Sequence, residues 1–390
     1  MTWLIMAVAA LGQAQGNAAA PQAPQQTAPA PPPVPPVRPS NDALEEAIRN
    51  DARLAALARR ALPEIEARAA RGDAEAMFVL AYFHRVGIGT PRDAARGLEW
   101  LRRSAEAGSL YAQHTLALVY LHGRDVPRDA AEGRRWLRRA ADGGHPPSMG
   151  LLGVMHAGGV DGATRDMTEA LRWLRPAAAA RDASAMAMLG MLYAEGAAPG
   201  GTPAEGLRLL QGAAEAGSVP GMFQLAITYL AGRVVPENRP EGLRWMRLAA
   251  ERGDARAMTA LGLIHWDGHG VPRDDAEGTR WLQRAAEAGD PSGMNYFSQA
   301  LARGRGIAQD GEASLRWMRR AVEAGDRDAP MILGLFAEHQ GRRDEALRLL
   351  RLAVERGNPR AAAELQRVEA GLPPAPRASP APAPPAQPPR

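Results

Sequence analysis

The residues best placed for metal chemistry are two histidines in the second half of the chain. His265 and His269 are four residues apart, the spacing at which two imidazoles on one helix can hold a metal ion. His269 lies between Gly268 and Gly270, however, and no third ligand follows at a matching distance. We therefore interpret His265 as a packing residue and predict no metal site and no cofactor.

The composition excludes several kinds of catalysis. The 390 residues include no cysteine, and all 47 basic residues are arginine. Thiolate nucleophiles, disulfides, Schiff bases and phosphate-binding loops that end in Gly-Lys-Ser/Thr all need one of the two missing residue types. Three Gly-x-Gly pairs lack the third glycine of a dinucleotide-binding loop and follow no strand, so we interpret them as turns. They are Gly87/Gly89, Gly268/Gly270 and Gly304/Gly306.

The charge of the chain is nearly balanced. The 47 basic and 43 acidic residues give a net charge of +4, and Arg38, Arg377 and Arg390 near the two ends carry three of these charges. Nucleic-acid binding depends on concentrated positive charge and on aromatic rings that stack on bases. The sequence shows neither pattern, so we predict no nucleic-acid partner.

The chain repeats itself about every 36 residues. The run Ala105-Glu106-Ala107-Gly108 returns as Ala214 to Gly217 and as Ala286 to Gly289. This spacing predicts eight units over residues 72–357, the last of them shorter. The unit boundaries are Gly72, Gly108, Gly144, Arg181, Gly217, Gly253, Gly289, Gly325 and Gly357.

Each unit has the pattern of two helices joined by a loop. The first half carries a small residue, a methionine in six units, and then leucine with glycine or alanine, as in Ala257, Met258 and Leu261-Gly262. These spacings place apolar residues on one helical stripe. A glycine ends the first helix, and Val-Pro-Arg-Asp at 126–129 and 271–274 predicts the start of the second, with aspartate as its cap.

This pattern, Ala-x-x-x-Leu-Gly-x-x-Tyr-x-x-Gly-x-Gly-Val-x-x-Asp followed by tryptophan and a small pair, resembles the Sel1-like repeat family, which is related to the tetratricopeptide repeats. The resemblance covers roughly three quarters of the chain. It implies an all-α, right-handed solenoid of helix-turn-helix units that serves as a scaffold or adaptor for other proteins. The eighth unit lacks the long loop around Gln340-Gly341 and is closer to the shorter tetratricopeptide form.

Two further columns recur with the period. We interpret a tryptophan column as the core between helices, because it recurs at the same place in six units. An arginine column one residue earlier follows glutamates by three residues, and we interpret it as a salt-bridged outer face. The tryptophans are Trp100, Trp136, Trp173, Trp245, Trp281 and Trp317, and the arginines are Arg135, Arg172, Arg208, Arg244, Arg280 and Arg316.

The first residues resemble a secretory signal. Trp3 to Leu11 is an apolar run that is too short to span a bilayer, which needs about 20 residues, and small residues follow it. We therefore expect a signal peptide at residues 1–20 and a periplasmic or exported protein, with a cytoplasmic location as the alternative. No other run approaches a membrane-spanning length, so we predict no transmembrane segment.

The remaining end segments are not repeats. Residues 21–41 and 372–390 are rich in proline and alanine, a composition that predicts disorder. Residues 42–71, interrupted at Pro63, predict a capping hairpin, and residues 358–371 a closing helix.

The candidate binding residues lie at positions where the repeat pattern does not specify the residue type. By analogy with tetratricopeptide arrays, positions three, six, ten and thirteen after each boundary should line the concave face. Apolar side chains exposed there would mark a partner-binding site. The alternative is that superhelical curvature buries them against neighbouring units. The candidates are Phe78, Tyr82, Tyr111, His114 and Leu118, and also Phe223, Ile227, Leu230, Leu263 and Trp266.

The expected function is therefore a non-enzymatic scaffold that binds a protein or peptide in the concave groove. The alternative is a hydrolase, because a cysteine-rich branch of the family has been associated with β-lactamase-like activity on cell-wall substrates. This chain has neither cysteine nor a Ser-x-x-Lys motif, so that branch is a poor match. A third interpretation is a passive spacer for the two proline-rich ends.

Overall fold

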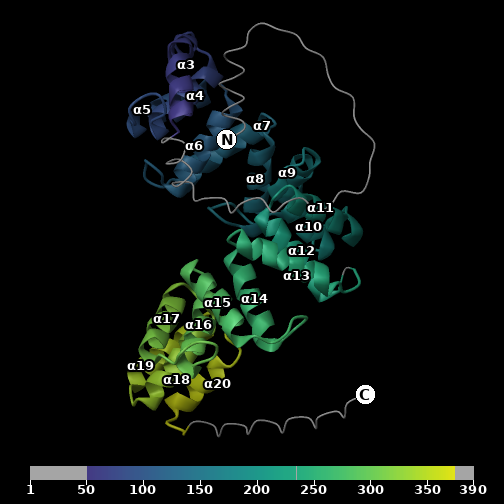
Figure 1. Cartoon of the computed structure of the whole chain (residues 1–390), viewed down its shortest axis with the longest axis vertical. Coiled ribbons are helices and arrows are strands. Elements are labelled where there is room, and N and C mark those ends of the chain that lie inside the picture. Colours follow the sequence, from purple (N-terminus) through teal and green to yellow (C-terminus); the bar gives the residue numbers. More distant parts are fainter. Residues whose placement is uncertain (1–50, 234, 374–390) are drawn as a thin grey trace. The chain divides into compact units, whose positions relative to one another are not determined.

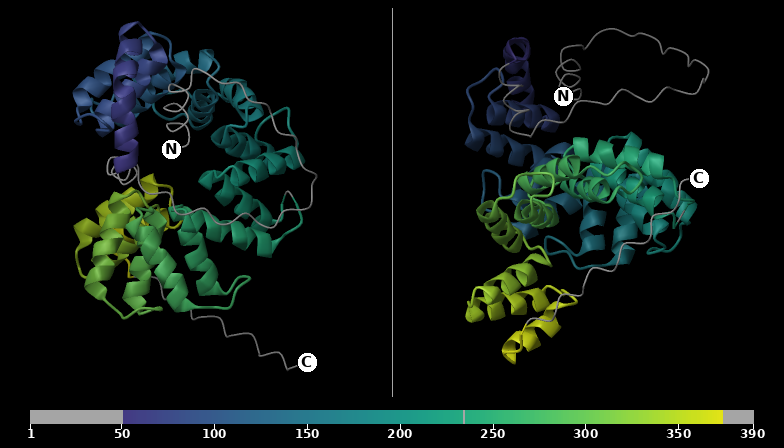
Figure 2. Two further views of the ribbon diagram at one scale, coloured as in Figure 1. Left: turned by 45° about the horizontal axis from the view of Figure 1, so that its top comes forward. Right: turned by 60° about the horizontal axis from the view of Figure 1, so that its bottom comes forward.

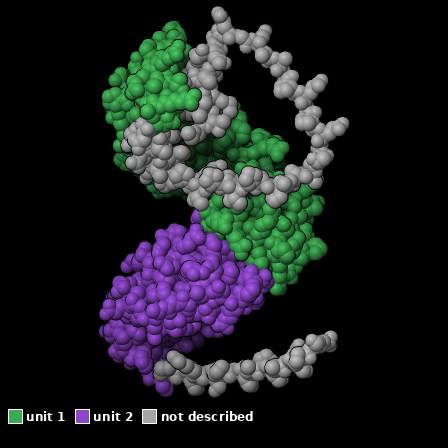
Figure 3. All heavy atoms as spheres, in the orientation of Figure 1, with its two compact units in different colours: residues 1–252 green, residues 253–390 purple. Residues whose placement is uncertain are grey.

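The computed structural model describes residues 51–233 and 235–373, and every regular element in those ranges is an α-helix. The chain divides into two units, residues 1–252 and 253–390 (Figure 3). The predicted signal peptide and linker, the first residues of the predicted capping hairpin and nearly all of the predicted C-terminal tail lie outside the described residues.

In unit 1, consecutive helices pack against one another in chain order (Figure 1). After a single leading helix, each pair consists of the first and second helix of one repeat. The helices are α3 (Ala52–Ala70), α4 (Ala74–Val86), α5 (Ala94–Glu106), α6 (Leu110–His122), α7 (Ala130–Asp142), α8 (Pro146–Gly158), α9 (Met167–Ala179), α10 (Ala183–Ala194), α11 (Pro203–Glu215), α12 (Val219–Ala231) and α13 (Arg239–Glu251).

Unit 2 continues the same pattern. It holds three hairpins and a closing helix, so the predicted all-α solenoid of repeated hairpins is confirmed. Its helices are α14 (Ala255–Asp267), α15 (Asp275–Glu287), α16 (Pro291–Arg303), α17 (Gly311–Glu323), α18 (Ala329–His339), α19 (Arg343–Glu355) and α20 (Ala361–Glu369).

The predicted period agrees with the backbone. All nine boundary residues have a left-handed backbone, with φ between 62° and 99°. Eight of them are glycine, which adopts this conformation without steric cost, and the ninth is Arg181. Each boundary therefore reverses the chain between the second helix of one hairpin and the first helix of the next.

Caps fix where the helices begin. The side chains of Asp73 and Asp182 accept hydrogen bonds from the backbone N–H groups of Ala76 and Ala185, at 3.0 and 2.8 Å. The predicted caps of the second helices are confirmed at Asp129 and Asp274, each of which accepts two backbone N–H groups of the following turn. These bonds satisfy donors that the helix itself leaves unpaired.

The two helices of a hairpin cross closely at small residues. A Cβ added to Gly206 on α11 would lie 2.7 Å from the carbonyl oxygen of Gly190 on α10, so both positions need glycine. In the seventh hairpin the equivalent residues are Ser298 and Ser314. Ser298 Oγ donates to the carbonyl oxygen of Ser314 at 2.8 Å.

The predicted core column needs a partial correction. Trp173 and Trp281 are buried as predicted, but Trp100, Trp136, Trp245 and Trp317 are only half-buried. The residue after each of the six tryptophans is buried. Leu137, Met246 and Leu282, for example, have no exposed surface. Arginines cover the indoles from the solvent side, because a guanidinium stacks favourably on an aromatic face. Arg103 lies 5.0 Å from the ring centre of Trp100, and Arg320 lies 4.1 Å from that of Trp317.

The break expected at Pro63 is absent. Helix α3 runs through Pro63 from Ala52 to Ala70, although proline costs about 3 kcal/mol inside a helix. Ala58 and Ile65, on either side of the proline, are almost fully buried against α4 and its loop, and this packing offsets the lost hydrogen bond.

Candidate partner-binding surface

The first helices of unit 1 form a row of their own. Helix α10 contacts both α8 and α12, and α4 contacts α6, whereas the second helices touch one another less. The row with the closer spacing lies on the inside of a stack of hairpins. In Figure 2 the colours of unit 1 run in chain order from hairpin to hairpin. Side chains on this row are therefore the place to look for a binding surface.

Aromatic rings from three successive hairpins meet on this row. Phe78 on α4 stacks on Tyr111 of α6, with ring centres 6.3 Å apart. Tyr111 meets His145 edge-on at 5.2 Å, and His145 lies 5.1 Å from His114. Tyr111 is 45% exposed, while Phe78 is buried beneath it. The rings thus form a continuous run whose exposed part is Tyr111.

Below the rings, Ser148 joins two histidines. Its Oγ lies 2.9 Å from Nδ1 of His114 and 2.9 Å from Nδ1 of His145. Burial, reinforced by the neighbouring His145, lowers the pKa of His114 from 6.5 to about 4. Burial also lowers the pKa of His145, although Asp182 acts in the opposite direction. Both imidazoles are therefore neutral at neutral pH.

This serine and histidine group does not have the geometry of a hydrolase site. A nucleophile must be reached by its substrate, and Ser148 has no exposed surface. Among the described residues, no carboxylate accepts a hydrogen bond from either imidazole, so the orienting acid of a catalytic triad is missing. The arrangement instead satisfies buried polar groups between α6 and α8.

His145 and Ser148 were missed in the sequence analysis. His145 stands in the column where other hairpins have an aspartate or serine cap, and Ser148 stands where they have alanine or glycine. Both departures from the repeat pattern fall in the same hairpin, and this coincidence could have indicated the histidine and serine group.

Two other predicted residues of this group are half-buried. Tyr82 on α4 lies 5.8 Å below the guanidinium of Arg85. Leu118 on α6 lines a small cavity of about 350 Å³, together with Leu151. The remaining wall of that cavity includes the Arg128–Asp161 ion pair, whose atoms are 2.6 Å apart.

The predicted binding residues on α12 differ in their exposure. Ile227 is 37% exposed and Phe223 is half-buried. Leu230 packs on the second helix of its own hairpin, because its Cγ lies in the space that a Cβ on Gly242 would take. Of these three residues, Ile227 contributes most to the exposed surface.

In unit 2, Trp266 is not an exposed groove residue. It is 6% exposed, its indole N–H donates to Thr279 Oγ1 at 3.1 Å, and the guanidinium of Arg305 covers its ring at 4.1 Å. Leu263 is half-buried against the same cluster. These contacts correct the expectation of exposure for Trp266, as burial does for Phe78. The second hairpin buries Phe78 and the loop after α16 covers Trp266, so neighbouring units bury both residues, as in the alternative that the sequence left open.

The outer arginine column is salt-bridged, as predicted. Arg172 pairs with Glu169 at 3.1 Å, Arg244 pairs with Glu241 at 3.0 Å, and Arg135 and Arg280 pair with the glutamates three residues earlier. Glu205 differs, because it closes a capping box with Thr202. Exposed pairs of this kind contribute about 0 to 1 kcal/mol each, so they solubilise the face more than they stabilise it.

The described residues contain no group of three or more His, Asp or Glu side chains arranged to hold a metal ion. His265 lies on α14, whereas His269 lies in the loop beyond Gly268. The two imidazoles are therefore not on one helical face. Within the same ranges, no helix combines the length and apolar character needed to cross a bilayer.

Comparison with known protein families identifies the repeats. The Sel1 repeat model matches seven consecutive segments, residues 74–109, 110–145, 146–182, 183–218, 219–254, 255–290 and 291–326. The chain therefore belongs to the Sel1 repeat family, and the predicted resemblance is confirmed. The eighth hairpin lies outside the matched segments, in keeping with its short turn.

Two solved structures are similar over most of the chain. The crystal structure of c5321, a protective antigen of uropathogenic Escherichia coli strains displaying an SLR fold, matches with 29% identity and a TM-score of 0.54, over 80% of this chain and 68% of that one. A Sel1 repeat protein from Oxalobacter formigenes matches with 30% identity and a TM-score of 0.50, over 79% and 90%. No curated protein sequence matches the chain. The Sel1 fold is typically a protein-interaction scaffold.

Proposed function

We propose that this chain is a non-catalytic scaffold that binds a protein or peptide partner through the first-helix row of unit 1. The observation that carries the proposal is Tyr111, a ring 45% exposed at the centre of an aromatic run that crosses three hairpins. Tyrosine presents a large contact area with a polar tip and is enriched at the centres of protein interfaces.

The support around Tyr111 favours binding over a purely structural role. Phe78 and His145 hold its ring from two sides, so little side-chain freedom remains to be lost when a partner docks. The neighbouring imidazoles are neutral because burial lowers their pKa values. An uncharged aromatic patch suits an apolar or aromatic partner side chain more than an anionic ligand.

The test is recovery of the partner from native extract with tagged variants. Tyr111→Ala should reduce recovery at least tenfold while the helical circular dichroism and the melting temperature stay near wild type, because truncating an exposed ring removes little packing. The triple variant Tyr82→Ala, Tyr111→Ala and Phe223→Ala should abolish it.

Two controls separate this surface from others. Val354→Ala truncates a similarly exposed apolar residue on α19 and should leave recovery unchanged. Replacing Arg172, Arg208 and Arg244 with glutamine should also leave recovery unchanged, because they lie on the outer arginine column. Loss in the arginine variant with full recovery in Tyr111→Ala would place the site on the outer face instead.

We further propose that the chain acts outside the cytoplasm, on the basis of the apolar run Trp3 to Leu11 and the small residues that follow it. Mass spectrometry of the native protein should find a first residue between Ala14 and Ala20. An uncleaved protein in the cytoplasmic fraction would contradict this location.

A further inference from the structure

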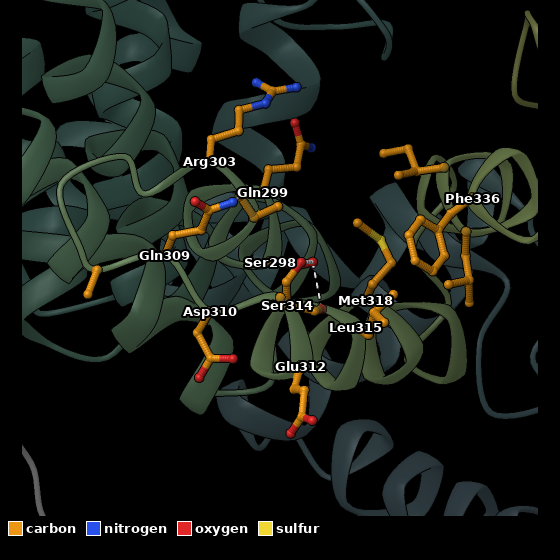
Figure 4. A pocket seen from close by; sticks show the side chains of 15 residues that line it. Ser298, Gln299, Arg303, Gln309, Asp310, Glu312, Ser314, Leu315, Met318 and Phe336 are labelled. Carbon is orange, nitrogen blue, oxygen red and sulfur yellow. Dashed lines mark hydrogen bonds between the residues drawn. The ribbon is translucent and has the colours of Figure 1, made fainter. Parts of the chain in front are cut away.

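A cavity of about 1020 Å³ lies in unit 2, between the seventh and eighth hairpins (Figure 4). Its walls are mainly apolar, with Leu315 and Met318 from α17 and Ile332 and Phe336 from α18. The Ser298–Ser314 pair lies at the helix crossing that forms part of the lining. A cavity of this size is at the upper end of the range of ligand sites.

The interface between two successive hairpins is called a seam below. The seam between the sixth and seventh hairpins shows what fills the equivalent place there. Between α16 and α17, residues 304–310 form a loop that docks on the sixth hairpin. Arg305 Nε lies 2.9 Å from Asp275 Oδ1, and Thr279 Oγ1 donates to the carbonyl oxygen of Arg305 at 2.7 Å. Ile307 packs against the apolar cluster of that seam. The loop thus supplies a basic residue, a glycine and an aliphatic side chain in succession.

Other seams are closed in a similar way. The loop after α8 docks on α7, because Arg134 of α7 donates to the carbonyl oxygen of Asp161. The carbonyl oxygen of Pro199, in the loop after α10, accepts from Arg175 Nη2 of α9 at 2.7 Å. Each of these loops covers part of the second helix of the preceding hairpin.

The eighth hairpin has no such loop. Helix α18 ends at His339 and α19 begins at Arg343, so only a tight turn separates them. Nothing from this hairpin therefore reaches the start of α17 in the way that residues 304–310 reach the start of α15.

The cavity lies at the place where, by comparison with the sixth hairpin, a loop would dock on the seventh. The residues that receive the loop in the sixth hairpin are Trp266, Asp275 and Thr279. One period of 36 residues later stand Ala302, Gly311 and Leu315, and all three line the cavity. Ala302 and Gly311 are smaller than their counterparts, which leaves more room than in the preceding seam.

The charge at the mouth is also suited to such a loop. Asp310 and Glu312 lie along one side of the cavity, away from Arg303 (Figure 4). The Glu312 side chain is 94% exposed and 3.7 Å from Arg316. Gly311 stands at the position of Asp275, so Glu312, the next residue, is the carboxylate that a basic residue of an incoming loop would meet.

We propose that this cavity is a docking site for an extended loop of a partner protein that carries a basic residue, a glycine and a branched aliphatic residue in succession. The loop completes the open seam as Arg305-Gly306-Ile307 completes the preceding one. This site is separate from the first-helix row of unit 1, so each proposal stands without the other.

The test uses the full chain and a synthetic peptide with the sequence of residues 302–310. The methyl signal of Met318, assigned with Met318→Leu, reports on the cavity by nuclear magnetic resonance with labelled methionine. Added peptide should shift this signal in a saturable way, because the aliphatic side chain enters beside Met318. The same peptide with Ile307→Asp should bind at least tenfold more weakly, because a carboxylate does not leave water for an apolar wall.

Protein variants test the charge and the location. Glu312→Arg should weaken binding at least threefold, and its matched control Glu323→Arg, at the other end of α17, should not. Grafting residues 304–309 into the turn after His339 should shift the Met318 signal without peptide and block the peptide from binding.

Three results would overturn the proposal. The first is an unchanged Met318 signal at millimolar peptide, and the second is equal shifts with the two peptides. The third concerns the chain's own tail: if truncation after Pro373 moves the Met318 signal in the absence of peptide, the occupant is the proline-rich tail and not a partner loop.

Discussion

Two seams of unit 2 are built from helices of the same repeat but differ in whether a loop covers them. One lies between the sixth and seventh hairpins, and the other lies between the seventh and eighth. In the former, Arg305 covers Trp266 and pairs with Asp275, and Trp266 is buried. In the latter, a cavity of about 1020 Å³ remains beside Leu315 and Phe336.

The difference shows that helix packing alone does not close these seams. The helices of each hairpin supply one layer of contacts, and the loop of the next hairpin supplies a second layer over the start of the second helix. The residues that distinguish a 36-residue Sel1 repeat from a shorter tetratricopeptide repeat are those of this loop. A hairpin without the loop therefore leaves an opening in the seam, and this opening becomes a candidate binding site.

The largest expected effect comes from Gly306→Ala, which should undock the loop of the closed seam. Gly306 has φ of +66°, and a Cβ there would overlap the backbone carbonyl of Asp275. The strain of the left-handed backbone and the overlap together should cost about 2 to 4 kcal/mol in free energy of unfolding. Urea denaturation followed by circular dichroism measures this loss.

The matched change in the open seam is Gly311→Ala, at the position one period after Asp275. A Cβ on Gly311 meets nothing within 4 Å, and this residue begins α17. Its substitution should change stability by less than about 0.5 kcal/mol, or raise it slightly, because alanine favours a helix over glycine. Equal losses at Gly306 and Gly311 would show that the loop does not close the earlier seam.

The period, the helices and most of the caps were predictable from the sequence, because they depend on local chemistry. A glycine every 36 residues, with aspartate or serine after it, specifies a left-handed turn and a helix start without reference to distant contacts. Even Arg181, which breaks the glycine pattern, adopts the conformation that its position in the period predicts.

The depth of burial was not predictable to the same degree. All six tryptophans of the column were assigned to the core, but only Trp173 and Trp281 are buried. The next residue, leucine or methionine, is buried in every case, as at Leu137 and Met318. A tryptophan pattern looks the same whether the indole is enclosed or half-covered by an arginine of its own helix, such as Arg139 over Trp136. Only the packed structure distinguishes the two cases.

The candidate site was predicted in part. Tyr111 and Ile227 are exposed as the groove prediction required, whereas Phe78 and Trp266 are buried by contacts with neighbouring hairpins. The cavity of unit 2 was missed, although its cause was visible in the short turn at Gln340-Gly341. To infer the cavity from that turn, one must know that the loop of one hairpin closes the seam behind it.

A smaller effect is expected at the Ser148 group, where the repeat also departs from its pattern. The pKa of His114 is lowered to about 4, whereas the unfolded chain has the usual value of 6.5. Between these values the unfolded state binds a proton that the folded state does not, so stability present above pH 6.5 is lost as pH falls toward 4. The loss should be about 1 to 3 kcal/mol.

Thermal melts at pH 8 and pH 5 measure this dependence. His114→Gln keeps a polar side chain beside Ser148 but removes the imidazole, so its melting temperature should fall less between the two pH values than that of the wild type. His122→Gln removes an exposed imidazole from the end of the same helix and is the control. An equally steep fall in His114→Gln would assign the pH dependence to other groups.

A further, small effect is expected at the one boundary that is not glycine, compared with its neighbour. Arg181 holds φ of 62°, a conformation that costs a residue with a side chain about 1 to 2 kcal/mol, and its side chain is exposed. Arg181→Gly should remove that strain, and the greater freedom of glycine in the unfolded chain offsets part of the gain, so the net stabilisation should be about 0.5 to 1 kcal/mol.

The reverse change is Gly144→Ala, at a boundary with φ of +86° and open space around it, which should cost about 1 kcal/mol from backbone strain alone. Opposite shifts of the urea midpoint in these two variants would show that the left-handed turn is a requirement of the boundary itself. A loss of stability in Arg181→Gly would mean instead that the arginine side chain makes a stabilising contact at the junction between the third and fourth hairpins.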